Sequence, residues 1–149
     1  MIGLLQRVTE ARVTVAGERV GAIASGLLVL VGVERGDGPP QAARLAERLL
    51  GYRVFADDAG RMNRSVADIG GAMLLVPQFT LAANTDKGTR ASFASAAEPE
   101  RGRELFEALI AAVRAAGVAV ETGRFGADMQ VALVNDGPVT FRLRAAPPA

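Results

Sequence analysis

The chain contains no cysteine and no histidine among its 149 residues. Without cysteine there can be no disulfide bond and no thiolate nucleophile, and metal sites built from cysteine or histidine are excluded as well. Without histidine, no catalytic triad can use an imidazole as its base. A hydrolase of this composition therefore needs a carboxylate base, a carboxylate-bound metal, or a catalytic group that the substrate itself supplies.

The sequence also lacks a strong charge imbalance and any long apolar run. Its net charge is only +1, far from the basic balance of proteins that envelop long nucleic acids, although a partner engaging only the end of an RNA would not demand more. No apolar run reaches the roughly 18 residues needed to cross a bilayer. Residues 1–7 lack the basic start and the cleavage site of a signal peptide. We therefore expect a cytoplasmic protein that binds neither membrane nor DNA.

What is present is a hydrophobic composition of 50%, which suits a single globular domain with a proper core. We assign residues 1–144 to this domain and expect residues 145–149 to form a disordered tail. The predicted elements are a hairpin over 13–23, strands over 27–33, 52–55, 72–76, 118–121, 129–134 and 139–143, and helices over 41–50 and 99–116. The apolar face of the second helix is expected to hold Leu105, Leu109, Ile110 and Val113. The pattern predicts an α/β fold.

Two short motifs follow or interrupt strand-like runs. Residues 77–83, which begin with Pro77 and Gln78, come directly after the apolar run 72–76, and residues 135–140 lie between two further runs. In the second motif Gly137 precedes Pro138, which cannot donate a ladder hydrogen bond and therefore marks a bend, a sheet edge or a cis peptide. Taken alone, this second motif is also compatible with an ordinary loop.

Together the two motifs resemble the signatures of the bacterial-type D-aminoacyl-tRNA deacylases, and the resemblance runs from Met1 to Leu143. It implies a layered α/β domain with two packed β-sheets and two main helices covering one side. It also implies a homodimer that hydrolyses the ester between a D-amino acid and the 3′ end of tRNA, accepts glycine and spares L-amino acids. No cofactor and no metal is expected.

The first motif supplies the expected catalytic residues Gln78, Phe79 and Thr80. We hypothesise that the backbone amides of Phe79 and Thr80 stabilise the oxyanion, while the free hydroxyl of the terminal ribose assists the attacking water. Thr80 could instead be a nucleophile, but no imidazole is present to activate it. It could also simply pack or cap within its loop.

The second motif supplies the expected chiral selectivity. The resemblance implies that the Gly137–Pro138 bond is cis and enters the active site of the partner subunit, where its carbonyls fill the space that an L side chain would need. Arg7 is expected to hold this motif in place, or else to be an ordinary strand residue whose charged end reaches solvent.

Phe125 and Met129 are candidate substrate-binding residues for the terminal adenosine or the amino acid, with core packing as the alternative. Pro77 departs from the family pattern, which usually has serine there, so a related deacylase with relaxed chirality that acts on L-alanyl-tRNA stays open. A third possibility is a non-catalytic module that binds RNA ends.

Overall fold

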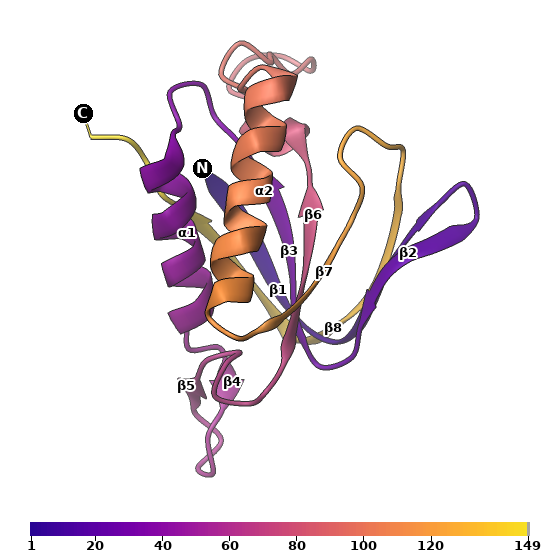
Figure 1. Cartoon of the computed structure of the whole chain (residues 1–149), viewed down its shortest axis with the longest axis vertical. Helices are drawn as coiled ribbons and strands as arrows, with labels where there is room; N and C mark the ends of the chain where they lie inside the picture. The colour runs from indigo at the N-terminus through magenta and orange to yellow at the C-terminus, as the bar shows by residue number, and fades with distance from the viewer. Residues whose placement is uncertain (149) are drawn as a thin grey trace.

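In the computed structural model, which describes residues 1–148, the chain forms one large sheet, two α-helices and a small hairpin (Figure 1). The elements in chain order are β1 (Ile2–Val15), β2 (Glu18–Ile23), β3 (Gly26–Gly32), α1 (Pro39–Gly51), β4 (Phe55–Ala56), β5 (Met62–Arg64), β6 (Ala72–Pro77), the 3₁₀ helix η1 (Phe79–Ala82), α2 (Pro99–Ala115), β7 (Ala119–Thr122) and β8 (Gln130–Arg144).

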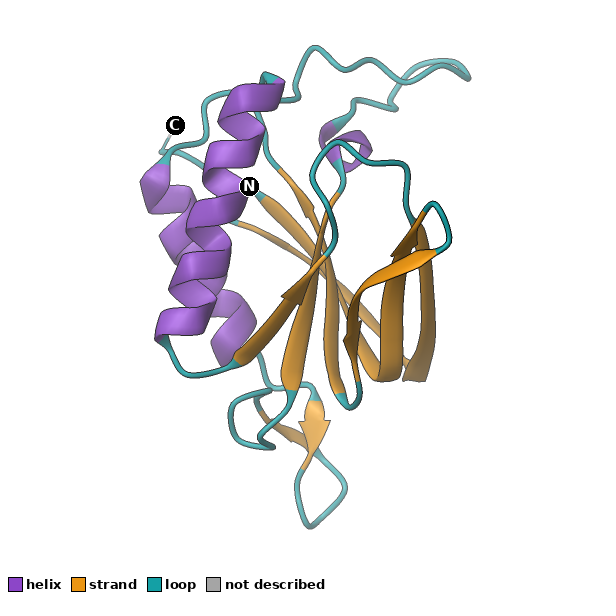
Figure 2. Cartoon of the chain, turned by 45° about the vertical axis from the view of Figure 1, so that its right-hand side comes forward, coloured by secondary structure: helices purple, strands orange, loops and turns teal. Residues whose placement is uncertain are grey.

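The long strand β1 divides the large sheet into two halves. Its first half, residues 2–8, pairs with β3, which continues through the parallel strands β6 and β7. Its second half, residues 11–15, pairs with β2, and β8 runs antiparallel along both halves. The sheet bends between the halves, so the β2 half lies across one face while both α-helices cover the other (Figure 2).

Side-chain alternation along the central strands explains the layers, because successive residues of a strand face opposite sides of the sheet. In β3, Leu27 and Val29 belong to the core under the helices, whereas Leu28 belongs to the core between the two sheet halves. In β6, Met73 belongs to the core under the helices and Leu74 to the core between the two sheet halves. The predicted α/β fold class is therefore confirmed. Its packed β layers are the two halves of one bent sheet, and β4 and β5 form a small separate sheet.

The two predicted helices are confirmed, with small shifts at their ends. Helix α1 begins with prolines, which need no hydrogen-bond partner in a first turn, and the Gln41 side chain accepts a hydrogen bond of 2.8 Å from the Gly38 amide. Helix α2 buries Leu105, Leu109 and Val113, as predicted, while Ile110 is half-buried. Both helices thus present an apolar stripe to the sheet.

Some predicted boundaries are wrong. Of the strand expected at 52–55 only Phe55 is extended in a sheet, and its partner strand β5 falls in a polar stretch where no element was expected. Ala145, which was expected in the disordered tail, is buried and exchanges backbone hydrogen bonds with Met1. Ala149, the end of that predicted tail, lies outside the described residues. Within residues 1–148 no helix is long and apolar enough to cross a membrane.

Candidate active site

A cavity of about 290 Å³ opens at the carboxyl ends of β3 and β6. Most of the residues that line it come from the first motif, which follows β6, from the first turns of α2 and from the loop after β7. Its lining residues are mostly apolar: Val31, Val33, Pro77, Gln78, Phe79, Ala97, Pro99, Gly102, Phe106, Phe125, Gly126, Ala127 and Met129. Volumes near 300 Å³ lie at the small end of the range for small-molecule sites.

At the first motif the chain turns from the end of β6 into η1, and Phe79 and Thr80 are exposed in this turn. The Gln78 amide still donates to the Val31 carbonyl at 2.8 Å, and the Leu81 amide then donates back to the Gln78 carbonyl at 3.2 Å to begin η1. The amides of Phe79 and Thr80 precede this first intrahelical bond, so the helix itself gives them no acceptor. Phe79 lines the cavity and Thr80 follows it directly, so both amides are candidate hydrogen-bond donors to a ligand.

The side chains of Phe79 and Thr80 are exposed to solvent. Phe79 is 64% exposed and packs against Phe93 with ring centroids 5.2 Å apart. The Gln78 side-chain amide lies 3.1 Å from the exposed Thr80 hydroxyl and donates to it. This contact orients the hydroxyl but cannot remove its proton, because a carboxamide nitrogen is not a base.

Phe125 and Met129 both line the cavity and are both half-buried, which combines the two alternatives that the sequence left open. The Phe125 ring packs between Phe106, at a centroid distance of 6.4 Å, and the guanidinium of Arg103, at 4.8 Å. Met129 accepts a hydrogen bond of 3.4 Å on its sulfur from the Arg124 amide. Phe106, which also lines the cavity, was not predicted from the sequence, although it lies on the buried face of α2 next to Leu105.

Among the described residues, none of those that line this cavity has an ionisable side chain. The carboxyl groups with shifted pKa values lie elsewhere in residues 1–148: Arg144 lowers the pKa of Glu34, the Asn63 side chain lowers that of Asp57, and the Ser65 amide lowers that of Asp68. Nor do the described residues contain a group of three or more histidine, cysteine, aspartate or glutamate side chains able to hold a metal ion. The described lining residues of the cavity therefore provide no side-chain acid or base.

The second motif forms a bulge at the opposite end of the sheet. Gln6 pairs with Thr140 and Val8 with Asn135, so residues 136–139 of β8 face Arg7 alone on β1. The Gly137–Pro138 peptide bond is cis, as the resemblance implies, and both residues are exposed. The motif therefore protrudes from the strand.

Two side chains fix this bulge at its base. Asn135 closes it internally, since its Oδ1 accepts from the Val139 amide at 2.7 Å and its Nδ2 donates to the Thr140 hydroxyl at 2.9 Å. Arg7 donates from Nε to the Asp136 carbonyl at 2.8 Å and from Nη1 to the Val54 carbonyl at 2.6 Å. Arg7 thus contacts the motif as expected, and Asn135 shapes the turn.

One chain does not bring its two motifs together. Arg7 pairs with Leu27, which pairs with Met73, whereas Phe79 lies six residues farther along and beyond the end of β6. At about 3.3 Å per strand residue, the bulge and the cavity mouth are separated by about 20 Å along the sheet. The structure thus gathers Gln78, Phe79, Phe125 and Met129 at one site, with Thr80 beside it, and places Arg7, Gly137 and Pro138 at the other end.

Comparison with known proteins relates the chain to a family of deacylases. The model of the family described as D-Tyr-tRNA(Tyr) deacylase matches residues 4–144. A D-aminoacyl-tRNA deacylase of Alkalilimnicola ehrlichii is 68% identical over 100% of this chain and 99% of its own length. One of Nitrosococcus oceani is 63% identical over 99% of this chain and 95% of its own.

Two solved structures share the fold of this chain. A protein described as a c-Myc DNA unwinding element binding protein superposes with a TM-score of 0.92 at 36% identity, covering 100% of both chains. A probable eukaryotic D-amino acid tRNA deacylase, at 18% identity and a TM-score of 0.77, covers 95% of this chain and 98% of its own and shares the fold. From its sequence match over nearly the whole length and its fold, the chain belongs to the D-Tyr-tRNA(Tyr) deacylase family.

Proposed function

We propose that this protein is a hydrolase that cleaves the ester bond of D-aminoacyl-tRNA and releases the free D-amino acid and tRNA. The observation that carries this proposal is a small apolar cavity lined by Gln78 and Phe79 of the first motif, in a chain of this family. A cytoplasmic location belongs to the same proposal, because aminoacyl-tRNAs are made and used there.

The chemistry suits a site without an acid or base. An aminoacyl ester is already activated, so catalysis requires mainly the positioning of water and the stabilisation of the developing oxyanion. The Phe79 and Thr80 amides donate to that oxyanion, and Gln78 keeps the turn in place through its bond to Val31. The neighbouring hydroxyl of the terminal ribose assists the water, replacing the side-chain base that the cavity lacks. A tRNA ending in the corresponding deoxyribose should therefore be hydrolysed far more slowly.

Thr80 acts in this scheme through its amide and not through its hydroxyl. The hydroxyl accepts a hydrogen bond from the Gln78 carboxamide, and the cavity lining offers it no ionisable partner. A threonine nucleophile needs a base to take its proton. Loop packing together with an amide contribution is therefore the interpretation that fits the contacts.

The cavity receives the terminal adenosine or the aminoacyl group against Phe125 and Met129. The Phe125 ring packs against Phe106 and the Arg103 guanidinium, and these contacts hold it as an apolar surface. Free adenosine should compete with substrate, and Phe125→Ala or Met129→Ala should weaken that competition. Unchanged competition in both variants would assign these side chains to core packing.

Selection of the D-isomer is proposed to require a second copy of the chain. The Gly137–Pro138 bulge lies about 20 Å along the sheet from the cavity of its own chain, at the strand spacing given above, so it can reach only the cavity of a partner. Strand β8 suits an interface, because it exposes Val134 and Phe141 and, among the described strands, pairs with β1 alone. A two-fold dimer would place each bulge in the opposite cavity.

In that position the bulge works by exclusion. Main-chain carbonyls of Gly137 and Pro138 bind the substrate ammonium and occupy the volume that an L side chain would need. A clash of this kind rejects L-amino acids whatever their side chain. It cannot reject glycine, which has no side chain to clash. Glycyl-tRNA, including glycine mischarged on tRNA for alanine, is therefore proposed as a further substrate.

Pro77 supports a second candidate, the related deacylase with relaxed chirality that acts on L-alanyl-tRNA. This residue lines the cavity directly and lacks both the hydroxyl and the backbone N–H that the usual serine would provide there. Phe79 and Arg7 keep the D-specific pattern, so we favour D-selectivity.

Hydrolysis of matched D-tyrosyl-, L-alanyl- and glycyl-tRNA by purified protein in a chelating buffer tests these alternatives. Release of D-tyrosine and glycine alone supports the main proposal, and comparable release of L-alanine supports the second candidate. Binding of aminoacyl-tRNA without any cleavage would leave a non-catalytic module that binds RNA ends.

A further inference from the structure

A second cavity, of about 330 Å³, adjoins the first, because Phe106 and Phe125 line both. The rest of its lining comes from β2, from α2, and from the end of β7 with the segment that follows it. Three of these residues are ionisable, namely Arg103, Glu107 and Arg124. The second cavity therefore carries charge where the described lining of the first carries none.

Arg103 stands at the wall that the two cavities share. Its guanidinium carbon lies 4.8 Å from the centroid of the Phe125 ring, which is a cation–π contact. Such a contact uses the charge of the guanidinium group and leaves its N–H donors unpaired. Arg103 thus holds the Phe125 ring and can still donate hydrogen bonds to a ligand.

Arg124 is fixed by its backbone at the point where the cavities meet. Its amide donates to the sulfur of Met129 at 3.4 Å, and its carbonyl accepts from the Ala127 amide at 3.2 Å. Met129 and Ala127 line the first cavity, whereas Arg124 lines the second. One short turn therefore joins the wall of the first cavity to an arginine of the second.

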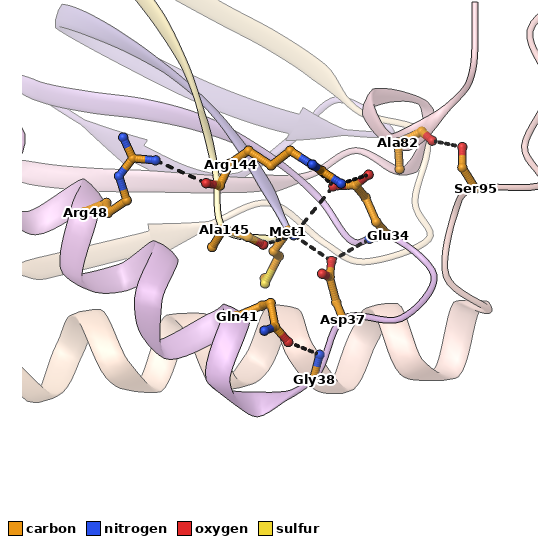
Figure 3. A network of polar contacts seen from close by, with 10 residues as sticks. All are labelled: Met1, Glu34, Asp37, Gly38, Gln41, Arg48, Ala82, Ser95, Arg144 and Ala145. Carbon is orange, nitrogen blue, oxygen red and sulfur yellow. Dashed lines mark hydrogen bonds and ion pairs between the residues drawn. The ribbon is translucent and has the colours of Figure 1, made fainter. Parts of the chain in front are cut away.

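Several arginines elsewhere in the fold bond to the chain itself. Arg144 donates to both carboxylate oxygens of Glu34, at 2.7 and 3.2 Å, and Arg48 donates to the Arg144 carbonyl at 3.1 Å (Figure 3). Within residues 1–148, by contrast, the guanidinium groups of Arg103 and Arg124 make no hydrogen bond and no ion pair with another residue. Both side chains are exposed, so their donors can bind a ligand.

Glu107 is the one acid among the described lining residues of the second cavity. It lies one helical turn after Arg103 on α2, so it opposes an anion that approaches the two arginines. Two positive charges against one negative charge still leave the cavity positive. Because the whole chain has a net charge of only +1, attraction for RNA has to come from local clusters of this kind.

We propose that the second cavity binds the phosphodiester group on the 5′ side of the terminal adenosine of tRNA, with Arg103 and Arg124 as the donors. This proposal rests on the proposed function, which places the end of the substrate against Phe125 in the first cavity. A nucleoside in RNA is covalently joined to its 5′ phosphate, so the adjoining cavity is the place for that phosphate. Guanidinium groups suit it, because each can donate two parallel hydrogen bonds to phosphate oxygens.

Direct binding of two RNA hairpins, measured by calorimetry, tests this proposal. Both end in single-stranded CCA; one has a natural backbone, and in the other the last phosphodiester is replaced by an uncharged methylphosphonate. The natural protein should bind the first RNA at least roughly fivefold more tightly than the second. Arg103→Gln and Arg124→Gln should each bring this ratio to about two or less, and each should lower the salt dependence, log Kd against log salt, by about 0.7. Glu107→Gln should raise the ratio.

Arg44→Gln is the matched control. It changes the net charge equally, but Arg44 lies on α1, outside the lining of both cavities, in an exposed ion pair of 3.0 Å with Glu47. This variant should keep the ratio of the natural protein. Because Arg103 and Arg124 are exposed, their variants should also keep its melting temperature.

Two results would overturn the proposal. A ratio near one in the natural protein, or an unchanged ratio in both arginine variants, would leave Arg103 only its contact with Phe125, whose loss weakens both RNAs equally. Competition by inorganic phosphate as effective as that by the natural RNA would assign the cavity to a free anion. The assay measures no hydrolysis, so a failure of the proposed deacylation is seen separately from a failure of this phosphate site.

Discussion

Substitution of Gly137 by alanine is the most informative single change in the second motif. Gly137 has φ +144°, a backbone angle that side-chain-bearing residues rarely adopt. A Cβ at this position would lie 2.7 Å from Cγ2 of Val139, 2.9 Å from the Val139 amide nitrogen and 3.2 Å from Nη2 of Arg7. Gly137→Ala should therefore strain the backbone and push the bulge away from Arg7.

A matched control separates the two contributions to the loss of unfolding free energy, backbone strain and the clash with Val139. Gly60 has φ +80° but no atom within 4 Å of an added Cβ, so Gly60→Ala incurs only the backbone cost of about 1–2 kcal/mol. Gly137→Ala adds displacement of Val139, which brings its total to about 2–5 kcal/mol. For a chain of this size that loss corresponds to a melting temperature lower by roughly 5–15 °C.

Urea unfolding measures this difference, and deacylation of D- and L-tyrosyl-tRNA measures its consequence. Gly137→Ala should hydrolyse the L-ester measurably, because the displaced carbonyls no longer fill the space of the L side chain, while Gly60→Ala should spare it. Equal stability of the two variants together with intact L-rejection in Gly137→Ala would refute the reasoning.

Three further changes test other parts of the account. Arg7→Gln removes the hydrogen bond from Nε to Asp136 in the bulge and the one from Nη1 to Val54 that anchors the guanidinium, and it should raise L-tyrosyl-tRNA hydrolysis at least tenfold while largely preserving D-hydrolysis; complete L-rejection would count against this role. Thr80→Val keeps the amide and should retain turnover within about tenfold, whereas near-complete loss with intact folding and binding would favour a nucleophile. Glu34→Gln should cost about 0.5–1 kcal/mol of unfolding free energy at pH 7. Because Arg144 lowers the pKa of Glu34 below its ordinary 4.5, that stabilisation is present above 4.5 and is lost as pH falls through the lower folded-state value, so variant and natural protein should converge in urea titrations at acidic pH.

Local sequence patterns predicted much of the fold, because each pattern reflects contacts within one element. The apolar spacing of 41–50 and 99–116 predicted both helices, and the continuous apolar runs 27–33 and 72–76 predicted strands covered on both faces. The bounds of β4 and the whole of β5 could not be predicted in this way. Both strands contain only a few residues, and their pairing depends on the hairpin between them.

The site was predictable in its parts but not in its geometry. The first motif follows a buried strand, so its place at a sheet edge could be expected from the sequence. The distance between Arg7 and Phe79 could not, because it depends on the registers of β1 with β3 and of β3 with β6. The ion pair of Met1 with Asp37 likewise arises from tertiary packing, which no local periodicity encodes.

The most direct test of the account is a mixing experiment, because the central claim is that two copies build each site. Gly137→Ala protein, which hydrolyses the L-ester if the account is right, is mixed and refolded with an excess of Phe79→Pro protein, which lacks one amide donor at the cavity but keeps an intact bulge. The control uses Phe79→Pro combined with Gly137→Ala. L-tyrosyl-tRNA hydrolysis should fall with added Phe79→Pro while D-hydrolysis persists, and it should not fall with the control. An L-rate that is unchanged across the titration would contradict a shared site.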